Sequence, residues 1–387
     1  FSGNPEFTSK ISISGEDLPQ LFKIAEIEPL ASELGKLSNK KFNLNASLHT
    51  DLGNKDLNID ELTLNVFGNK INAEIYTRNL GSDTPAARGK LNASGPDLPP
   101  LIKIAYQFSG ASKKEINSLA KQLASTPKLF NIESVFDIDL KAGIADIPSL
   151  SIKALGMLTS AKLKAKKINS SSPILNGELE ASGPDLPLIM QIVQRMQKAD
   201  SESIKLSKNL GKVKSKSFNI KTNFDANLSS GKIDLPLLSI DTLGVNIGGS
   251  LKGKNIQKNS GSMKGSISIV SKNPKPLLIA LGQSDIAEVL KSIDINTDIS
   301  GNTSNIGLKP LSLVAIFSGK NIPNSPVELK IRADSEINLE KEILNLDSLQ
   351  VSGLGLDVKG KVKASKFKTN PAYVGQITVA PFDLKKF

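Results

Sequence analysis

The stretch PEFTSKISISGEDLPQLFKIA, from Pro5 to Ala25, decides the fold because it recurs along the chain. It returns without a gap as PAARGKLNASGPDLPPLIKIA from Pro85 to Ala105, and a third copy, PILNGELEASGPDLPLI, begins at Pro173. Matches at a regular period indicate a chain built from copies of one supersecondary unit, each of which buries its apolar face only by stacking on its neighbours.

Two fainter copies extend the array. GSISIVSKNPKPLL begins at Gly265, and NPAYVGQITVAPFDLKKF, from Asn370, aligns with NPEFTSKISISGEDLPQLF at Asn4, with Asp383 opposite Asp17. We therefore predict one continuous array over residues 1–387 rather than separate domains. The predicted repeats span about 4–83, 84–171, 172–259, 260–369 and, in part, 370–387. The shared phase of the two ends is typical of a window cut from a longer array.

Each repeat begins with a strand and a short helix. Apolar residues alternate in the strand, as at Ile11 and Ile13, and a Gly–x–Asp–Leu–Pro sequence follows. Asp17, Asp97 and Asp185 are predicted helix N-caps, and the proline in the first turn lacks only an N–H that has no partner there. In the first repeat, helical spacing predicts one helix that carries Leu18, Leu21, Phe22, Ala25, Leu30 and Leu34.

Alternating apolar runs after the helix predict strands with one dry and one wet face. In the first repeat the runs are Phe42–Leu48, Leu57–Ile59, Leu62–Val66 and Ile71–Ile75. The parity of the alternation changes between Ile59 and Leu62, which predicts a β-bulge or tight bend near Asp60 that keeps both halves facing one way. The second and third repeats show the same order, in Val135–Leu140, Ile147–Ile152, Leu155–Leu158, Leu163–Ala165, Phe218–Leu228, Ile233–Ile240, Val245–Ile247 and Leu251.

The predicted fold class is mostly β, with short helices. We expect about five strands per repeat, and additional strands in the longer fourth repeat around Leu311–Phe317 and Val327–Ile331. Short connections rich in Gly, Asn and Asp favour antiparallel pairing. One short helix per repeat is too little to cover the whole apolar face, so we predict a repeat-built, elongated and curled sheet that forms an open hydrophobic groove.

The composition limits the classes of function. The chain has no Cys, which excludes disulfides, Cys-based metal sites and thiol catalysis. No apolar run approaches the ~20 residues of a membrane span. The formal charge is +11, but the lysines are spread along the chain with few aromatics between them, which argues against nucleic acid as a partner. A solvated surface and contact with anionic lipid headgroups stay open as explanations of the basic balance.

No catalytic or metal-binding constellation is found in the sequence. His49, the single histidine, has the parity of the wet strand face, so we expect a surface position rather than a general base. The lysines of Lys162–Lys167 and Lys359–Lys363 alternate with apolar residues. This pattern predicts a solvated outer strand face, with headgroup contact as the alternative. We predict that the protein is not an enzyme and uses no cofactor.

The repeat order resembles that of the AsmA family of bacterial envelope proteins, which are AsmA/TamB-like and of the bridge-like lipid-transfer type. The passages most similar to the family are YVGQITVAPFDLKKF (Tyr373–Phe387), IDTLGVNIGGSLKG (Ile240–Gly253) and LNLDSLQVSGLGLDVKGKVKA (Leu344–Ala364), and the resemblance covers nearly the whole chain. It implies a gutter-like β-groove that conducts phospholipids between the inner and outer membranes of a Gram-negative bacterium and supports outer-membrane homeostasis. It also implies a periplasmic location, an inner-membrane anchor helix outside this sequence, and protein partners in the envelope.

On this interpretation the inward apolar residues of the strands line the groove and hold acyl chains. The predicted lining is Ile11, Ile13, Leu44, Leu48, Leu62, Leu64, Val66, Ile71, Ile75, Leu91, Val135, Ile138, Leu150, Ile152, Leu163, Leu179, Phe218, Ile220, Leu238, Ile240, Val245, Ile247, Leu251, Ile267, Ile269, Leu311, Leu313, Leu329, Ile331, Leu349, Val351, Ile377 and Val379. The alternative is a structural or assembly scaffold with a closed core, whose exposed strand edges pair with partner proteins or nascent outer-membrane strands.

Overall fold

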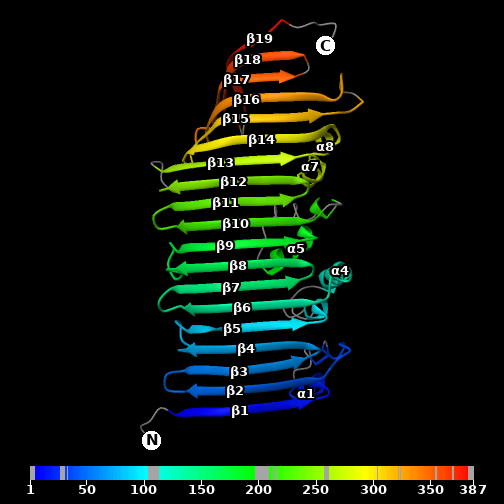
Figure 1. Cartoon of the computed structure of the whole chain (residues 1–387), viewed down its shortest axis with the longest axis vertical. Coiled ribbons are helices and arrows are strands. Elements are labelled where there is room, and N and C mark those ends of the chain that lie inside the picture. Colours follow the sequence, from blue (N-terminus) through cyan, green and yellow to red (C-terminus); the bar gives the residue numbers. More distant parts are fainter. Residues whose placement is uncertain are drawn as a thin grey trace. The chain divides into compact units, whose positions relative to one another are not determined.

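The computed structural model describes residues 5–26, 31–32, 34–102, 113–196, 209–211, 213, 216–256, 261–302, 304–320, 322, 324–353, 355–367 and 370–381. Within these residues the chain forms nineteen β-strands, each antiparallel to its neighbours, in an open sheet that does not close into a barrel (Figure 1). The predicted fold class, mostly β with short helices, is therefore confirmed. The chain divides into two compact units, residues 1–181 and 182–387.

The elements follow the repeat order. The first compact unit contains β1 (Glu6–Gly15), α1 (Leu18–Ile24), β2 (Phe42–Asp51), β3 (Asp56–Val66), β4 (Asn69–Arg78), β5 (Ala86–Gly95), α4 (Lys113–Leu123), β6 (Phe130–Asp139), β7 (Ile144–Ala154), β8 (Met157–Lys166) and most of β9 (Ile174–Gly183). The second contains α5 (Leu186–Met196), β10 (Phe218–Asn227), β11 (Lys232–Thr242), β12 (Val245–Lys254), β13 (Ser262–Ser271), α7 (Lys275–Ala280), α8 (Ser284–Val289), β14 (Leu290–Gly301), β15 (Asn305–Phe317), β16 (Val327–Asn338), β17 (Ile343–Gly353), β18 (Leu356–Ser365) and β19 (Ala372–Val379).

Tight turns join the third and fourth strands of the first three repeats. Phe67–Gly68, Leu155–Gly156 and Leu243–Gly244 have positive φ at both positions. This is the geometry of a type I′ turn, whose twist matches that of the flanking strands. A leucine disfavours positive φ, but the Leu155 and Leu243 side chains are buried, and Leu243 packs with Leu210 and Ala280. Burial therefore offsets the backbone strain at these turns.

A β-bulge interrupts one strand of each of the first three repeats, and strands β14, β15 and β17 of the fourth. In β3, Leu48 pairs with Ile59 and Ser47 with Glu61, so Asp60 is the extra residue. This confirms the predicted bend. Similar register shifts occur within Ile147–Leu150, Leu235–Leu238, Leu308–Leu311 and Leu346–Leu349. At each of these places the apolar residues on both sides of the shift face the same way, because the bulge resets the parity.

The bulge explains why the predicted number of strands is wrong. The predicted runs 57–59 and 62–66 belong to one bulged strand, β3, so the described part of each of the first three repeats has four strands. The extra strands predicted in the fourth repeat are confirmed as β15 and β16. One helix per repeat is also wrong, because residues 98–102 are helical in addition to α4, and the fourth repeat contains both α7 and α8.

The predicted N-caps are confirmed at two of the three aspartates. The Asp17 carboxylate accepts a hydrogen bond from the Gln20 N–H (3.0 Å), and the Asp185 carboxylate accepts one from the Leu188 N–H (2.9 Å). Asp97 does not form the matching bond, because the residue three positions later is Pro100, which has no N–H. Among the described residues, Oδ1 of Asp97 is buried without a hydrogen-bond partner.

The first helix is shorter than its apolar spacing predicts. α1 ends at Ile24 with Ala25 as its C-cap, and Glu26 leaves the helix with a φ of 59°. Helical geometry resumes at residues 31, 32 and 34, and Leu34 is buried. Leu30, and Asp383 of the last repeat, lie outside the described residues.

Replacing the aspartates tests the N-cap assignment. Asp17→Ala and Asp185→Ala each remove a carboxylate that satisfies a helix N–H, and each is expected to lower the free energy of unfolding by about 1 kcal/mol. Asp97→Ala is the matched control and is expected to leave it unchanged or slightly raised, since no cap is lost. Urea unfolding followed by circular dichroism measures all three, and an equal loss at Asp97 would contradict the assignment.

Two neighbouring glycines of β12 differ in how much space surrounds their Cα atoms. A Cβ added to Gly249 would lie 2.5 Å from the carbonyl oxygen of Ser266 on β13, whereas a Cβ added to Gly248 would meet no atom within 4 Å. Gly249→Ala is expected to lower the free energy of unfolding by about 1–3 kcal/mol, because the strands must move apart. Gly248→Ala is expected to be neutral or mildly stabilising, because it restricts the unfolded chain. Equal urea midpoints for the two variants would refute the close approach of β12 and β13.

Candidate functional site

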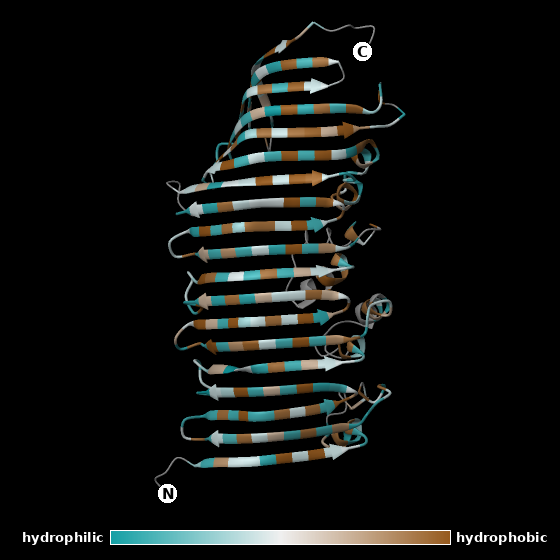
Figure 2. Ribbon diagram, in the orientation of Figure 1, coloured by the Kyte–Doolittle hydropathy of each residue, from teal (hydrophilic) through white to brown (hydrophobic). Residues whose placement is uncertain are grey.

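One side of the sheet carries an unbroken row of apolar residues in each compact unit. In the first unit, direct cross-strand pairing connects Ile13, Leu44, Leu64, Ile71, Ala93, Ile132 and Ile152. In the second unit it connects Ile220, Ile240, Ile247, Ile269, Ile295, Leu313, Ile331, Val351, Val358 and Val379. Figure 2 shows hydrophobic and hydrophilic residues alternating along the strands. We call the side with these rows the apolar face and the opposite side the charged face.

The apolar face is free of charge wherever pairing is described. Among the cross-strand partners in β1–β8 and β10–β19, no Asp, Glu, Lys or Arg side chain lies on this face. Its polar residues there are uncharged, as at Ser134, Thr159 and Thr297. Because successive side chains of a strand point to opposite faces, the charged residues of these paired positions lie on the other side.

All but one of the predicted lining residues lie on the apolar face. Leu179 of β9 belongs with them because it alternates with Glu178, which forms an ion pair with Lys162 of the charged face. Most of these residues are half-buried, but Phe218 and Val245 are buried, and Ile13, Ile377 and Val379 are exposed. The structure therefore brings the predicted residues together by face within each compact unit, as neighbours on successive strands.

Val135 is the exception and corrects the prediction. It pairs with Lys90 and Ser149, so its side chain lies on the charged face. Its neighbour Phe136, which the sequence prediction omits, pairs with Gly89 and lies on the apolar face. The error is one of phase, since a shift of one residue moves every side chain of a strand to the other face.

A local motif could have set the correct phase of β6. The strand begins Phe130–Asn131–Ile132, which matches Phe42–Asn43–Leu44 at the start of β2 and Phe218–Asn219–Ile220 at the start of β10. Phe42, Phe130 and Phe218 are all buried. Counting by two from Phe130 reaches Phe136 rather than Val135, so alignment of the three motifs identifies the apolar residue.

The large buried side chains of the apolar face lie at one end of the strands, next to the helices. The ring of Phe42 contacts Gly15 at the end of β1, and the ring of Phe130 contacts Gly95 at the end of β5. In the second unit a cluster joins the helices to the β11–β12 turn and consists of Leu210, Val213, Leu243 and Ala280, with Met190 of α5 and Leu277 of α7 packed against it. Figure 1 shows the helices at this end of the strands. Residues farther along the strands, such as Leu251, are half-buried and stay accessible.

Beside the bulges, large and small side chains alternate from strand to strand on the apolar face. In the first unit the row is Ile11, Ala46, Leu62, Ala73, Leu91, Ser134, Leu150 and Ala161. In the second it is Thr222, Leu238, Gly249, Ile267, Thr297, Leu311 and Ala333. In the next row, a Cβ on Gly89 or Gly265 would lie 2.1 Å from a carbonyl oxygen of the neighbouring strand. Such alternation and such glycines are typical of the concave side of a curved sheet.

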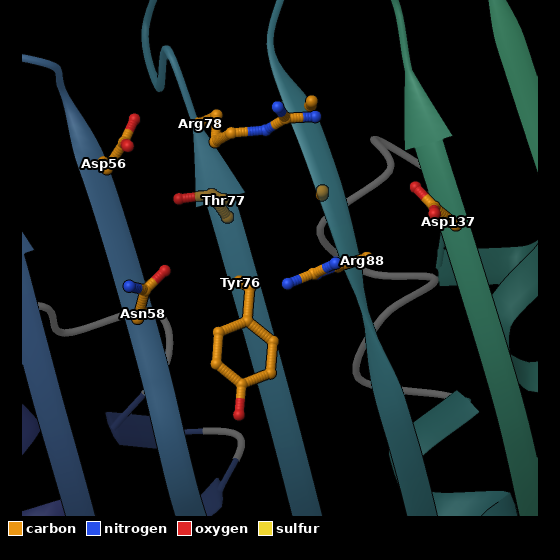
Figure 3. Close-up of a pocket in the computed structure, with 9 residues that line it drawn as sticks. Asp56, Asn58, Tyr76, Thr77, Arg78, Arg88 and Asp137 are labelled. Atoms are coloured by element: carbon orange, nitrogen blue, oxygen red, sulfur yellow. The ribbon is translucent and has the colours of Figure 1, made fainter.

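A hollow on the charged face of the first unit is lined by groups of opposite charge (Figure 3). The guanidinium of Arg88 lies over the Tyr76 ring, 5.6 Å from its centroid, and Arg78 forms an ion pair with Asp139 at 3.3 Å. Asp56 accepts a hydrogen bond from the Asn79 N–H. The two arginines and the two aspartates of the lining balance in formal charge, and the Thr77 hydroxyl donates to the carbonyl oxygen of Leu57.

His49 lies on the charged face, as its parity predicts. Its Nδ1 is 3.1 Å from the Thr8 hydroxyl on the neighbouring strand, in an exposed hydrogen bond. In the described ranges, no three His, Cys, Asp or Glu side chains are placed to hold a metal ion together. Every helix in the described part of the chain falls short of the length and apolar character that crossing a membrane needs.

A pair of glutamate substitutions tests the assignment of faces in β6. Phe136→Glu places a charge on the apolar face and is expected to lower the free energy of unfolding by about 2–4 kcal/mol. Val135→Glu places the same charge opposite Lys90 on the charged face and is expected to change it by less than about 0.5 kcal/mol. Urea unfolding of both variants is the measurement. The reverse order of effects would show that the register of β6 is shifted by one residue.

Comparison with protein families, characterised proteins and solved structures finds no match for this chain. The resemblance to the AsmA family therefore stays a prediction. The uncharged face is the feature of the molecule on which a functional proposal can be built.

Proposed function

We propose that this chain is a segment of a lipid-transfer protein that binds phospholipid acyl chains on its apolar face and conducts them between two membranes. The observation that carries the proposal is the exclusion of charge from this face at every described cross-strand pair of β1–β8 and β10–β19. Such a surface binds methylene chains at ~0.8 kcal/mol per buried CH₂ without reading their chemistry. Weak specificity allows a bound chain to slide.

The accessible part of the apolar face needs an apolar cover. Soluble proteins rarely expose contiguous apolar patches of more than a few hundred Å², and larger patches mark binding surfaces. Leu64, Ile71 and Leu251 are half-buried, and the large buried side chains of this face gather at the helix end of the strands. Half-buried leucines across the width of a sheet do not fit a closed core. Acyl chains have the chemistry and the adaptable shape to complete their burial.

Three backbone and side-chain features support a sheet that bends around its apolar face. Bulges recur in β3, β7, β11, β15 and β17. Glycines on the apolar face, such as Gly89 and Gly265, stand where strands approach closely. Large and small side chains alternate beside the bulges, which relieves crowding on a concave surface. Bulges and in-strand glycines are the devices that curve β-sheets, so we place the acyl chains in a groove lined by the apolar face.

The AsmA resemblance supports the cargo and the location of this proposal. It rests on Tyr373–Phe387, Ile240–Gly253 and Leu344–Ala364. From it we propose phospholipid as the cargo, the periplasm as the location, and an inner-membrane anchor as part of the whole protein. Transfer toward the outer membrane would then support outer-membrane homeostasis.

Native mass spectrometry of the purified chain, followed by organic extraction and lipid identification, tests the proposal directly. We expect several phospholipid molecules per chain, because the apolar rows cross many strands. A lipid-free protein that also fails to take up added phospholipid would overturn the proposal. That outcome would favour the alternative function, an envelope scaffold with a closed core.

Substitutions on the two faces test the path of the lipid. Leu64→Arg and Leu251→Arg place a charge in the middle of the apolar face and are expected to slow transfer of a fluorescent phospholipid between vesicles at least about tenfold, because burying an unpaired charge against acyl chains is costly. Thr63→Arg and Ser250→Arg, the adjacent residues on the charged face, are the matched controls and are expected to transfer normally. Circular dichroism and urea midpoints monitor the fold. Wild-type transfer rates in the two leucine variants would contradict the proposed path of the lipid.

A further inference from the structure

The fourth strand of the second repeat, β8, carries Lys162, Lys164 and Lys166 on the charged face, and neighbouring acids pair with two of them. Lys162 forms an ion pair with Glu178 of β9, and Lys164 forms one with Asp146 of β7, both at 3.3 Å. These lysines are two-thirds exposed. Two of the three lysines of this row are therefore paired with acids on the flanking strands, whereas Lys166 lies opposite Ile144.

The third repeat has one of these pairs at the equivalent position. Lys252 of β12 forms an ion pair with Asp234 of β11 at 3.4 Å. Asp234 directly precedes the bulge sequence that begins at Leu235, as Asp146 precedes the one that begins at Ile147. The lysine and its acid thus belong to the repeat pattern rather than to one place in the chain.

The fourth repeat keeps the lysines but not the acids. β18 carries Lys359, Lys361 and Lys363 on the charged face. The partner of Lys363 on β17 is Asn345, at the position that holds Asp146 and Asp234 in the earlier repeats. The partner of Lys361 on β19 is Gln376, at the position that holds Glu178. Two carboxylates have therefore been exchanged for uncharged amides beside this row.

The other neighbours of the lysine row are also largely neutral. Lys359 pairs with Gln350 and Thr378. In the part of the chain that the structure describes, none of the three lysines forms an ion pair. Asp347 of β17 lies on the same face, in the bulge between the pairs Leu346–Val362 and Leu349–Gly360, which is opposite Lys361. Glu336 first, with Asp334 and Asp347 in addition, holds the pKa of Lys309 above its usual range. Two carboxylates, Asp347 of β17 and Asp357 of β18, thus lie on this face beside the three cations, so the row keeps a positive excess.

We propose that Lys359, Lys361 and Lys363 of β18 form a docking surface for an anionic phospholipid bilayer. Alternate residues of a strand are about 6–7 Å apart, so the ammonium groups form an evenly spaced row on an open sheet face. Lysines act as point charges without the fork geometry that selects one phosphate or carboxylate. Such a row matches a laterally extended anionic surface, which attracts each nearby lysine independently.

The chemistry favours a bilayer over an acidic polypeptide. Peptide recognition uses apolar anchor pockets, a paired strand edge or arginine clusters. The cross-strand partners of these lysines are Asn345, Gln350, Gln376, Thr378 and the exposed Val374, and no arginine is among them. The lysines lie on the side of the sheet opposite the apolar face, so this inference goes beyond acyl-chain binding and does not depend on it.

Vesicle flotation of the full chain tests the docking surface. The probes are vesicles of phosphatidylcholine alone and of phosphatidylcholine with phosphatidylglycerol. We expect binding only to the anionic vesicles, and we expect added salt to weaken it. The triple variant Lys359→Gln, Lys361→Gln, Lys363→Gln is expected to bind the anionic vesicles on the order of 100-fold more weakly at low salt.

β8 supplies a control matched in spacing and in charge. The triple variant Lys162→Gln, Lys164→Gln, Lys166→Gln removes the same three charges at the same spacing from another strand. Because Glu178 and Asp146 neutralise part of that row, it is expected to lower vesicle binding by no more than about threefold. An equal loss from both triple variants would show that only net charge matters, and would overturn the proposal.

Restoring the missing acids tests the inference without removing a lysine. Asn345→Asp with Gln376→Glu recreates the carboxylates of the earlier repeats beside Lys363 and Lys361. This double variant is expected to lower binding to anionic vesicles by roughly tenfold. Wild-type binding by the double variant would overturn the proposal, and so would stronger binding of polyglutamate than of vesicles, which would identify an acidic polypeptide as the partner.

A further variant separates this inference from acyl-chain binding. Leu64→Arg is expected to lose phospholipid transfer yet to keep its binding to anionic vesicles, because the lysine row of β18 is unchanged. Failure of transfer in the wild-type chain would therefore count against the proposed function alone. Loss of vesicle binding in Leu64→Arg, with the fold intact by circular dichroism, would count against the docking surface.

Discussion

The molecule depends on keeping one face of every strand free of charge through a long series of strands. In a β-strand a slip of one residue sends every side chain to the opposite face, so a repeat array of this kind must control parity at each step. The bulges do this. Asp60 is left out of the pairing between β2 and β3, and the apolar residues before and after it stay on one side. A charged side chain on that side would lose its solvation against apolar neighbours without gaining a partner.

Tight packing of large side chains and accessible apolar surface occur at different parts of the same strands. At the helix end, Phe42 and Phe130 pack on glycines of the adjacent strand. Leu155 and Leu243 have a strained positive φ in their turns, and the burial of their side chains offsets this strain. This end holds the tightly packed core. Farther along the strands the large side chains of the apolar face, such as Leu251, are half-buried or exposed, and it is there that a ligand could complete the burial.

The two faces differ in how much the repeats vary. On the apolar face the same kinds of residue return in each strand, as expected of a surface that binds by contact area alone. On the charged face the lysines recur, but the acidic partner Asp146 of β7 is replaced by the uncharged Asn345 in β17. Repeats with the same backbone pattern can therefore share an apolar face along the whole array while, in the described part of the chain, only one of them carries a row of lysines without ion pairs.

Much of this architecture could be read from local sequence patterns. Period-two alternation identified the strands, the parity change at Ile59–Leu62 identified the first bulge, and Asp17 and Asp185 were correct N-caps. Each of these features depends on residues that are close together in the sequence, within one strand or one helix turn. The errors arose where a second local signal competed with the first. Pro100 removed the N–H that Asp97 would cap, and a bulge merged two predicted strands into β3.

The sequence by itself determined the repeats, the antiparallel β class and the apolar character of one strand face, because these follow from local spacing. Only the tertiary structure decided which residues stand opposite each other across strands. Val135 faces Lys90 rather than the apolar rows, and Lys363 faces Asn345 rather than an acid. Cross-strand register joins residues that are distant along the chain, and it is set by bulges and turns acting together, so a single run of sequence does not reveal it.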